Sequence, residues 1–290
     1  MLSRDDVIYG YQFLLGRDPE SDEIIVSQQQ NHTSLADFRT SLLRSTEFIG
    51  QESHILGATA DALSIRFHGR SDSLLLAALL ENAFKKALAL ESRLTPEILS
   101  MPGMSGRQYR RLINNLVGSM PDPRYLEIGS WTGSTACAAM YGNQARITCI
   151  DNWSQFGGPR ETFFHNINTF RNERTQFDFI EADFREIDYG ALGKYNIYLF
   201  DGPHGYQDQF DGTIAALAAL DSEYVFIVDD WNWSEPRDGS LSALRSRGLD
   251  PVYSIEIRTT QDGTHPPIQM QNSDWHNGYY MAVIRRNGLL

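Results

Sequence analysis

The sequence predicts an α/β fold in which a mainly parallel sheet of seven strands is covered by helices on both faces. Downstream of Pro121, short apolar runs alternate with segments of helical pattern. These runs are apolar on both faces, as expected for strands that helices cover from both sides. The last two runs are separated only by a polar loop, which favours an antiparallel strand pair at the end of the sheet.

The residues before the sheet are predicted to be helical and to form a small domain of their own. A length of 290 residues corresponds to about two domains, and 41% hydrophobic residues supply a sizeable core. We expect a helical module at residues 1–50, a helical connector at 51–100 and the α/β domain at 101–290. The sequence contains no internal repeat.

Helical spacing supports this division. An acidic pair, Asp5-Asp6, can cap a first helix, which ends at Gly16 before Pro19. A second amphipathic helix is expected at Ser34–Phe48, and further helices at Ser71–Leu94 and Arg107–Met120. The apolar positions of the first helix recur three and four residues apart: Val7, Ile8, Tyr11, Leu14 and Leu15.

The elements of the α/β domain follow in alternation. Helices are expected at Thr135–Met140, Glu161–Asn172 and Asp208–Leu220. The seven expected strands are Arg124–Ile128, Arg146–Ile150, Phe177–Glu181, Tyr195–Phe200, Tyr224–Val228, Val252–Arg258 and Tyr279–Arg286.

Composition narrows the range of partners and compartments. The 25 basic and 37 acidic residues give a net charge of -12, which argues against binding to nucleic acid or anionic membranes. The longest apolar run, Leu74–Leu80, is too short to span a bilayer. No signal peptide is visible, and Cys137 and Cys149 show no metal-type spacing. We therefore expect a cytoplasmic protein with reduced thiols.

The first strand runs into a glycine-rich turn, Tyr125-Leu-Glu-Ile-Gly-Ser-Trp-Thr-Gly133. Its glycines allow a ligand to approach the backbone, and the following helix offers free N–H groups. The next strand ends in Asp151, where a carboxylate can accept hydrogen bonds from ribose hydroxyls. The glycine spacing is G-x-x-x-G and fits a nicotinamide-type loop poorly.

These segments, with Glu181-Ala-Asp-Phe184 after the third strand, resemble the cofactor signature of class I S-adenosylmethionine-dependent methyltransferases, which have a Rossmann-like sheet. The resemblance covers roughly residues 100–286. It implies that the cofactor is S-adenosylmethionine, with Asp151 at the ribose and Glu127 near the methionine amino end. The alternative is that these carboxylates are solvated strand ends. The cofactor-binding residues implied are Glu127, Gly129, Ser130, Gly133, Ser134, Asp151, Asp183, Phe184 and Asp201.

Three further carboxylates follow the fourth and fifth strands. Asp201 follows one strand, and Asp229-Asp230 follow the other. If the two strands are neighbours, these groups meet at one edge of the sheet, and hard oxygen ligands suit Mg²⁺. Neighbouring residues of a strand point to opposite faces, so both members of the pair can be ligands only if the chain turns there. Otherwise the pair caps a helix or a turn.

The pattern Asp201-Gly-Pro-His-Gly-Tyr206 with a later Val-Asp-Asp230 resembles metal-dependent sugar O-methyltransferases of the macrocin and mycinamicin type. The resemblance implies that Asp201, Asp229 and Asp230 bind the metal and that His204 is the general base. Asn232 is a further polar candidate near the metal. Residues 11–48 resemble a second family, the small helical DUF4214 module that bacteria attach to glycan-related proteins.

The sequence therefore predicts an S-adenosylmethionine-dependent O-methyltransferase, assisted by Mg²⁺, that acts on a hydroxyl of a sugar, glycan or glycosylated natural product. It predicts no nucleic-acid partner and no membrane span, and leaves a homo-oligomer open. One alternative is a metal-independent small-molecule methyltransferase, and another is a non-catalytic glycan-pathway protein. The loop Thr259–Asn277 is a substrate lid, a subunit contact or a solvated insertion.

Overall fold

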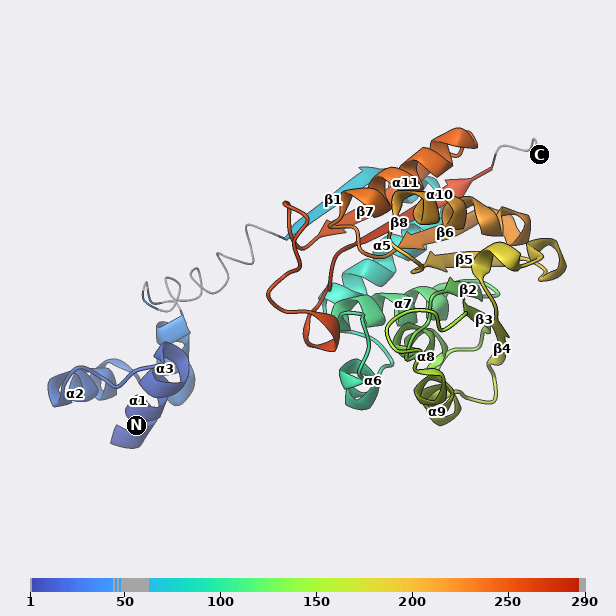
Figure 1. Ribbon diagram of the computed structural model, residues 1–290. Helices are drawn as coiled ribbons and strands as arrows, with labels where there is room; N and C mark the ends of the chain where they lie inside the picture. The colour runs from blue at the N-terminus through green and yellow to red at the C-terminus, as the bar shows by residue number, and fades with distance from the viewer. Residues whose placement is uncertain (1, 44, 46, 48–62, 287–290) are drawn as a thin grey trace. The chain divides into compact units, whose positions relative to one another are not determined.

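The computed structural model describes residues 2–43, 45, 47 and 63–286, and the chain forms two compact units, 1–62 and 63–290 (Figure 1). Each unit has its own apolar core. Among the described residues, no helix combines the length and the apolar character needed to cross a bilayer.

The first unit contains short helices around a small core. They are α1 (Arg4–Gly10), which continues into a π-helical turn (Tyr11–Leu15), α2 (Asp22–Asn31) and α3 (Leu35–Leu43). Ser3 caps α1 in a reciprocal capping box with Asp6. The predicted end at Gly16 is confirmed, whereas α2 was not predicted because it buries only Ile25. The end of the second predicted helix, at Phe48, lies outside the described residues.

The second unit contains one sheet of eight strands in the order β1-β7-β8-β6-β5-β2-β3-β4 (Figure 1). Strands β4, β3, β2, β5 and β6 are parallel, and the remaining pairs are antiparallel. The strands are β1 (Ser64–Gly69), β2 (Arg124–Ile128), β3 (Arg146–Asp151), β4 (Gln176–Glu181), β5 (Tyr195–Phe200), β6 (Leu220–Val228), β7 (Pro251–Arg258) and β8 (Tyr279–Arg285).

The Rossmann-like mixed sheet confirms the predicted fold class, but the expected number of seven strands was wrong. The eighth strand, β1, lies inside the segment predicted to be a helical connector, and it pairs antiparallel with β7 at the sheet edge. Residues 66–69 of β1 are exposed, so this strand lacks the apolar pattern that revealed the others. The antiparallel pair β7–β8 is confirmed, although β7 is not the edge strand.

Helices cover both faces of the sheet and enclose two apolar cores. One face packs against α5 (Leu75–Leu88), α7 (Arg107–Ser119), α8 (Ser134–Met140) and α9 (Arg160–Phe170). The other face packs against α11 (Ser234–Ser246), the end of α10 (Tyr206–Ala215) and the short turn that directly follows α10. The short α6 (Pro96–Ser100) precedes α7. Both predicted faces of the buried strands are therefore filled.

The parallel arrangement brings the ends of β2, β3 and β5 close together. The N–H of Asp201, at the end of β5, donates to Ile128 of β2, and the N–H of Gly129 donates to Ile150 of β3. The backbone of Gly129 then passes so close to Asp201 that a Cβ at residue 129 would lie 1.8 Å from the Asp201 carbonyl oxygen. Only a glycine permits this approach.

Replacing this glycine is expected to disturb the sheet edge. Gly129 has a φ of +83°, so Gly129→Ala combines backbone strain with steric overlap and is expected to cost about 3 kcal/mol of unfolding free energy. Gly157→Ala is the control, because Gly157 has a φ of +80° with no described atom within 4 Å of its added Cβ. It is expected to lose only about 1 kcal/mol. Equal losses in urea unfolding would contradict the close approach.

Candidate active site

A cavity of about 460 Å³ lies beyond the carboxyl ends of the parallel strands. Its volume is in the range of small-molecule and cofactor sites, about 300–1,000 Å³. The glycine-rich turn after β2 and the segments that follow β3, β4, β5 and β6 line it, together with the loop between β7 and β8. This is the position at which open α/β sheets bind their ligands.

Most of the residues predicted to bind the cofactor line this cavity. They are Gly129, Ser130, Ser134, Asp151, Asp183, Phe184 and Asp201. Glu127 and Gly133 do not line it. A Cβ at Gly133 would meet the Phe163 ring at 2.9 Å, so this glycine allows helix packing instead of forming a floor under a ligand.

Asp151 anchors the glycine-rich turn. One carboxylate oxygen accepts hydrogen bonds from the backbone N–H groups of Ser130 and Trp131, at 2.8 and 3.0 Å. The other oxygen accepts from the N–H of Trp153, at 2.8 Å. Each carboxylate oxygen has two lone pairs, so the second oxygen, Oδ1, can still accept one hydrogen bond from a ligand in the cavity.

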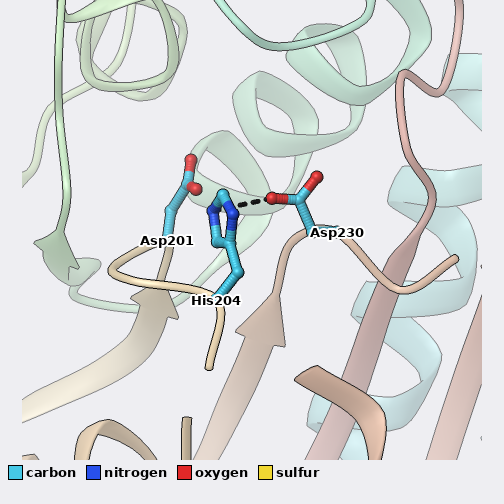
Figure 2. Close-up of side chains that lie close together, drawn as sticks. All are labelled: Asp201, His204 and Asp230. Atoms are coloured by element: carbon cyan, nitrogen blue, oxygen red, sulfur yellow. Dashed lines mark ion pairs between the residues drawn. The ribbon is translucent and has the colours of Figure 1, made fainter. Parts of the chain in front are cut away.

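Three side chains meet at the ends of β5 and β6 (Figure 2). Asp201, His204 and Asp230 each offer a ligand atom, and these atoms lie within 4.8 Å of one another. The imidazole of His204 lies between the two carboxylates, and its Nε2 is 2.7 Å from Oδ2 of Asp230. Strands β5 and β6 are neighbours, as the prediction required.

The chain turns where the carboxylate pair follows β6. Asp230 has a φ of +55°, so its side chain leaves the alternation of the strand and points toward His204. Asp229 lines the cavity, and its Oδ1 accepts a hydrogen bond of 2.6 Å from the N–H of Asp230. Asp229 does not belong to the group of three that could hold a metal ion, and its role as a ligand stays a prediction.

The loop between β7 and β8 supplies residues that sequence reasoning did not assign. His265, His276 and Asn277 line the cavity, and Asn277 Nδ2 donates to Asp230 Oδ1 at 2.7 Å. Their partners are distant in sequence, so no local spacing could identify them. Asn232, predicted to lie near the metal, is buried away from the cavity and accepts hydrogen bonds from Thr259 and Thr260 N–H groups instead.

Residues 126–231, from β2 to the turn after β6, match the family described as "Methyltransferase domain". This match confirms the predicted enzyme class, an S-adenosylmethionine-dependent methyltransferase. The resemblance to the macrocin type and to DUF4214 is not confirmed. No curated protein sequence matches this chain.

Solved structures of methyltransferases also match this chain. An O-methyltransferase from Bacillus cereus with bound SAH is 15% identical over 74% of this chain and 94% of that one, with a TM-score of 0.42. The O-methyltransferase TomG from Streptomyces achromogenes, bound to SAM and involved in tomaymycin synthesis, is 13% identical over 71% and 89%, with a TM-score of 0.45. The SAH-bound methyltransferase PaMTH1 from Podospora anserina is 13% identical over 84% and 98%, with a TM-score of 0.43.

Acidic side chains crowd together at one end of the cavity. Burial and the charges of neighbouring carboxylates raise the pKa values of Asp201 and Asp229 well above their usual range. Burial lowers the pKa of His204, but its hydrogen bond to Asp230 and the nearby carboxylates outweigh this and raise the pKa. Burial opposes the ionisation of Asp230, but the hydrogen bond with His204 lowers its pKa. Asp230 is thus paired with the imidazole, while Asp201 and Asp229 keep their protons to a higher pH than exposed carboxyl groups do.

Glu127 lies in the core of the second unit, just before the glycine-rich turn. Its side chain is fully buried, and the hydroxyl of Tyr125 donates a hydrogen bond of 2.6 Å to it. Burial raises the pKa of Glu127 to about 7, against about 4.3 for an exposed glutamate. The folded protein therefore holds this proton over a pH range in which the unfolded chain has released it.

Glu127 is expected to make the protein less stable as the pH rises from about 4.5 to about 7, because the unfolded chain then binds fewer protons than the folded protein. Glu127→Gln removes this loss, and its stability relative to the wild type is expected to grow by on the order of 3 kcal/mol between about pH 5 and pH 8. Urea unfolding without cofactor measures the difference, with the exposed Glu186→Gln as control. A difference that does not change with pH would refute a raised pKa.

Proposed function

We propose that this chain transfers a methyl group from S-adenosylmethionine to a hydroxyl of a sugar, glycan or glycosylated natural product, assisted by Mg²⁺. The observation that carries the proposal is the group Asp201, His204 and Asp230 at one end of the cavity. His204 could accept a proton there, and Asp201 and Asp230 offer oxygen ligands. Because the glycine-rich turn lines the same cavity, the hydroxyl to be methylated and the cofactor would bind next to each other.

The cofactor half of the cavity has the polar groups that an adenosyl ligand requires. When bound, S-adenosylmethionine supplies a sulfonium methyl that is already a strong electrophile. The residues of this chain then have to bind and align it against the acceptor oxygen. Asp151 would accept from the ribose, and Asp183 and Phe184 would border the adenine. Ser134, at the start of α8, also lines this space, and its hydroxyl is 3.0 Å from that of Ser105.

The acceptor half is the end of the cavity that contains Asp201, His204 and Asp230. There, His204 would take the proton of the reacting hydroxyl. Asp230 holds the imidazole through Nε2, which orients the ring, and Asp201 lies on its other side. The donor set fits Mg²⁺, because carboxyl oxygens of Asp201 and Asp230 converge there and Mg²⁺ prefers oxygen ligands. A bound divalent cation would lower the pKa of an acceptor hydroxyl.

The hydrogen-bonded pair of His204 and Asp230 favours a second candidate, a metal-independent methyltransferase. A carboxylate that orients a histidine and stabilises its protonated form is sufficient for general-base catalysis in other enzymes. In this second reading, Asp201 and Asp229 shape the electrostatics of the cavity without binding an ion. The two candidates differ in what chelation does to turnover.

The identity of the acceptor depends on the sequence resemblance to sugar O-methyltransferases. A small-molecule or glycan acceptor, the absence of a nucleic-acid partner, a homo-oligomer and a cytoplasmic location all stay predictions. A screen of sugars, glycosides, small phenols and a short RNA with labelled S-adenosylmethionine tests the acceptor class directly.

Asp151→Ala is expected to weaken S-adenosylmethionine binding by about 100-fold, because the ribose loses a charged acceptor. Calorimetry measures the binding of this cofactor and of its demethylated product. Asp151→Asn keeps one oxygen that can accept from the N–H groups of the turn. Its melting temperature reports on the anchoring of the turn, and its cofactor affinity reports on ribose binding. No binding of either compound to the wild type would contradict the proposed function.

Removing the metal is expected to abolish turnover if Mg²⁺ takes part. EDTA should stop methyl transfer and added Mg²⁺ should restore it, while Asp201→Asn should raise the Mg²⁺ requirement roughly tenfold or more. His204→Ala should retain cofactor binding but lose about 10²–10⁴-fold in turnover. The exposed Asp238→Asn serves as control. Turnover that EDTA leaves unchanged, with His204 still required, would select the metal-independent candidate.

A further inference from the structure

The loop between β7 and β8 is connected to the carboxylate group by a chain of hydrogen bonds. His204 Nε2 lies 2.7 Å from Asp230 Oδ2, and Asn277 Nδ2 donates to Asp230 Oδ1 at 2.7 Å. The other end of the same amide, Asn277 Oδ1, lies 3.1 Å from His265 Nδ1. Asn277 and Asp230 are almost completely buried, at 2% and 4% exposure.

The orientation of the Asn277 amide determines the direction of these bonds. Its NH₂ group faces Asp230 and its oxygen faces His265, and an amide oxygen can only accept a hydrogen bond. The Nδ1 atom of His265 must then carry the proton and donate it. In the neutral imidazole this leaves the Nε2 atom of His265 with a free lone pair.

His265 lines the cavity next to Trp233. Its ring meets the edge of Trp233 at 5.1 Å between centroids and 87° between planes. The same indole lies 5.2 Å from the ring of His204. Trp233, His204 and His265 all line the cavity, so an acceptor against the indole would lie near both imidazoles.

We propose that His265 is a specificity-determining residue whose Nε2 accepts a hydrogen bond from a second hydroxyl of the methyl acceptor, and that Asn277 is the positioning residue that fixes it. This inference rests on the proposed O-methyl transfer. The acceptor class is then a molecule with at least two hydroxyls. His204 takes the proton of the reacting hydroxyl, and His265 holds the other. Asn277 connects the two halves of the acceptor site because it also holds Asp230.

The tautomer of His265 can be tested without any acceptor. In histidine-labelled protein at alkaline pH, long-range ¹⁵N–¹H NMR should show His265 protonated at Nδ1 and bare at Nε2. Asn277→Ala should remove this preference, while Ile268→Ala, an exposed residue of the same loop, should leave it unchanged. A wild-type His265 protonated at Nε2 would overturn the proposal.

The acceptor role is tested with pairs of probes that differ by one hydroxyl: catechol against phenol, and methyl glucoside against its monodeoxy derivatives. His265→Ala should raise the KM of the methylated diol roughly tenfold, with kcat and cofactor affinity little changed. The KM of the partner that lacks the second hydroxyl should not change. Asn277→Ala should raise KM and lower kcat as well, since Asp230 loses its donor.

Two outcomes separate the claims. If the wild type methylates a diol but His265→Ala leaves its KM within about twofold, the role of His265 is wrong and the methyltransferase function stands. If the wild type methylates none of the probes, nor any acceptor of the wider screen, the proposed function fails, whatever the NMR shows about the tautomer.

Discussion

The site depends on the burial of three carboxyl groups at the end of two adjacent parallel strands. Asp201, Asp229 and Asp230 converge because β5 and β6 pair in register, and the apolar core beneath them leaves little solvent to screen their repulsion. Uncompensated buried charge is costly, so such groups are expected to be neutralised, paired or bound to a cation. The imidazole of His204 and the amide of Asn277 compensate part of this charge.

The surrounding backbone is shaped to keep these groups in place. Asp230 adopts a positive φ that directs its side chain out of the strand, and Gly129 lets the cofactor turn pass against Asp201. Strained backbone persists only where the surrounding structure enforces it, and it is found most often at functional sites. A site held this rigidly can stabilise developing charge without rearranging at the moment of reaction.

The sequence predicted the sheet well because its central strands are buried on both faces and therefore apolar throughout. Strand β2 and strand β5 have the predicted ends, and the glycine-rich turn and Asp151 line the predicted cavity. Strand β1 was missed because an edge strand with exposed side chains carries no such pattern. Glu127 has the motif position expected of a ligand-binding carboxylate, yet its side chain faces the core, which a motif does not specify.

The residues of the loop between β7 and β8 could not be predicted, because their position follows from sheet topology rather than from local pattern. Strand β8 lies between β6 and β7 and is antiparallel to both. Both ends of this loop therefore lie next to the carboxyl end of β6, which Asp230 follows. Backbone hydrogen bonds from Trp231 to Gly278 and from Asn232 to Asn277 join the end of the loop to the turn after β6. Asn232 binds the start of the loop, at Thr259 and Thr260. The antiparallel insertion of β8 therefore makes both ends of this loop a fixed part of the site and holds Asn277 beside Asp230.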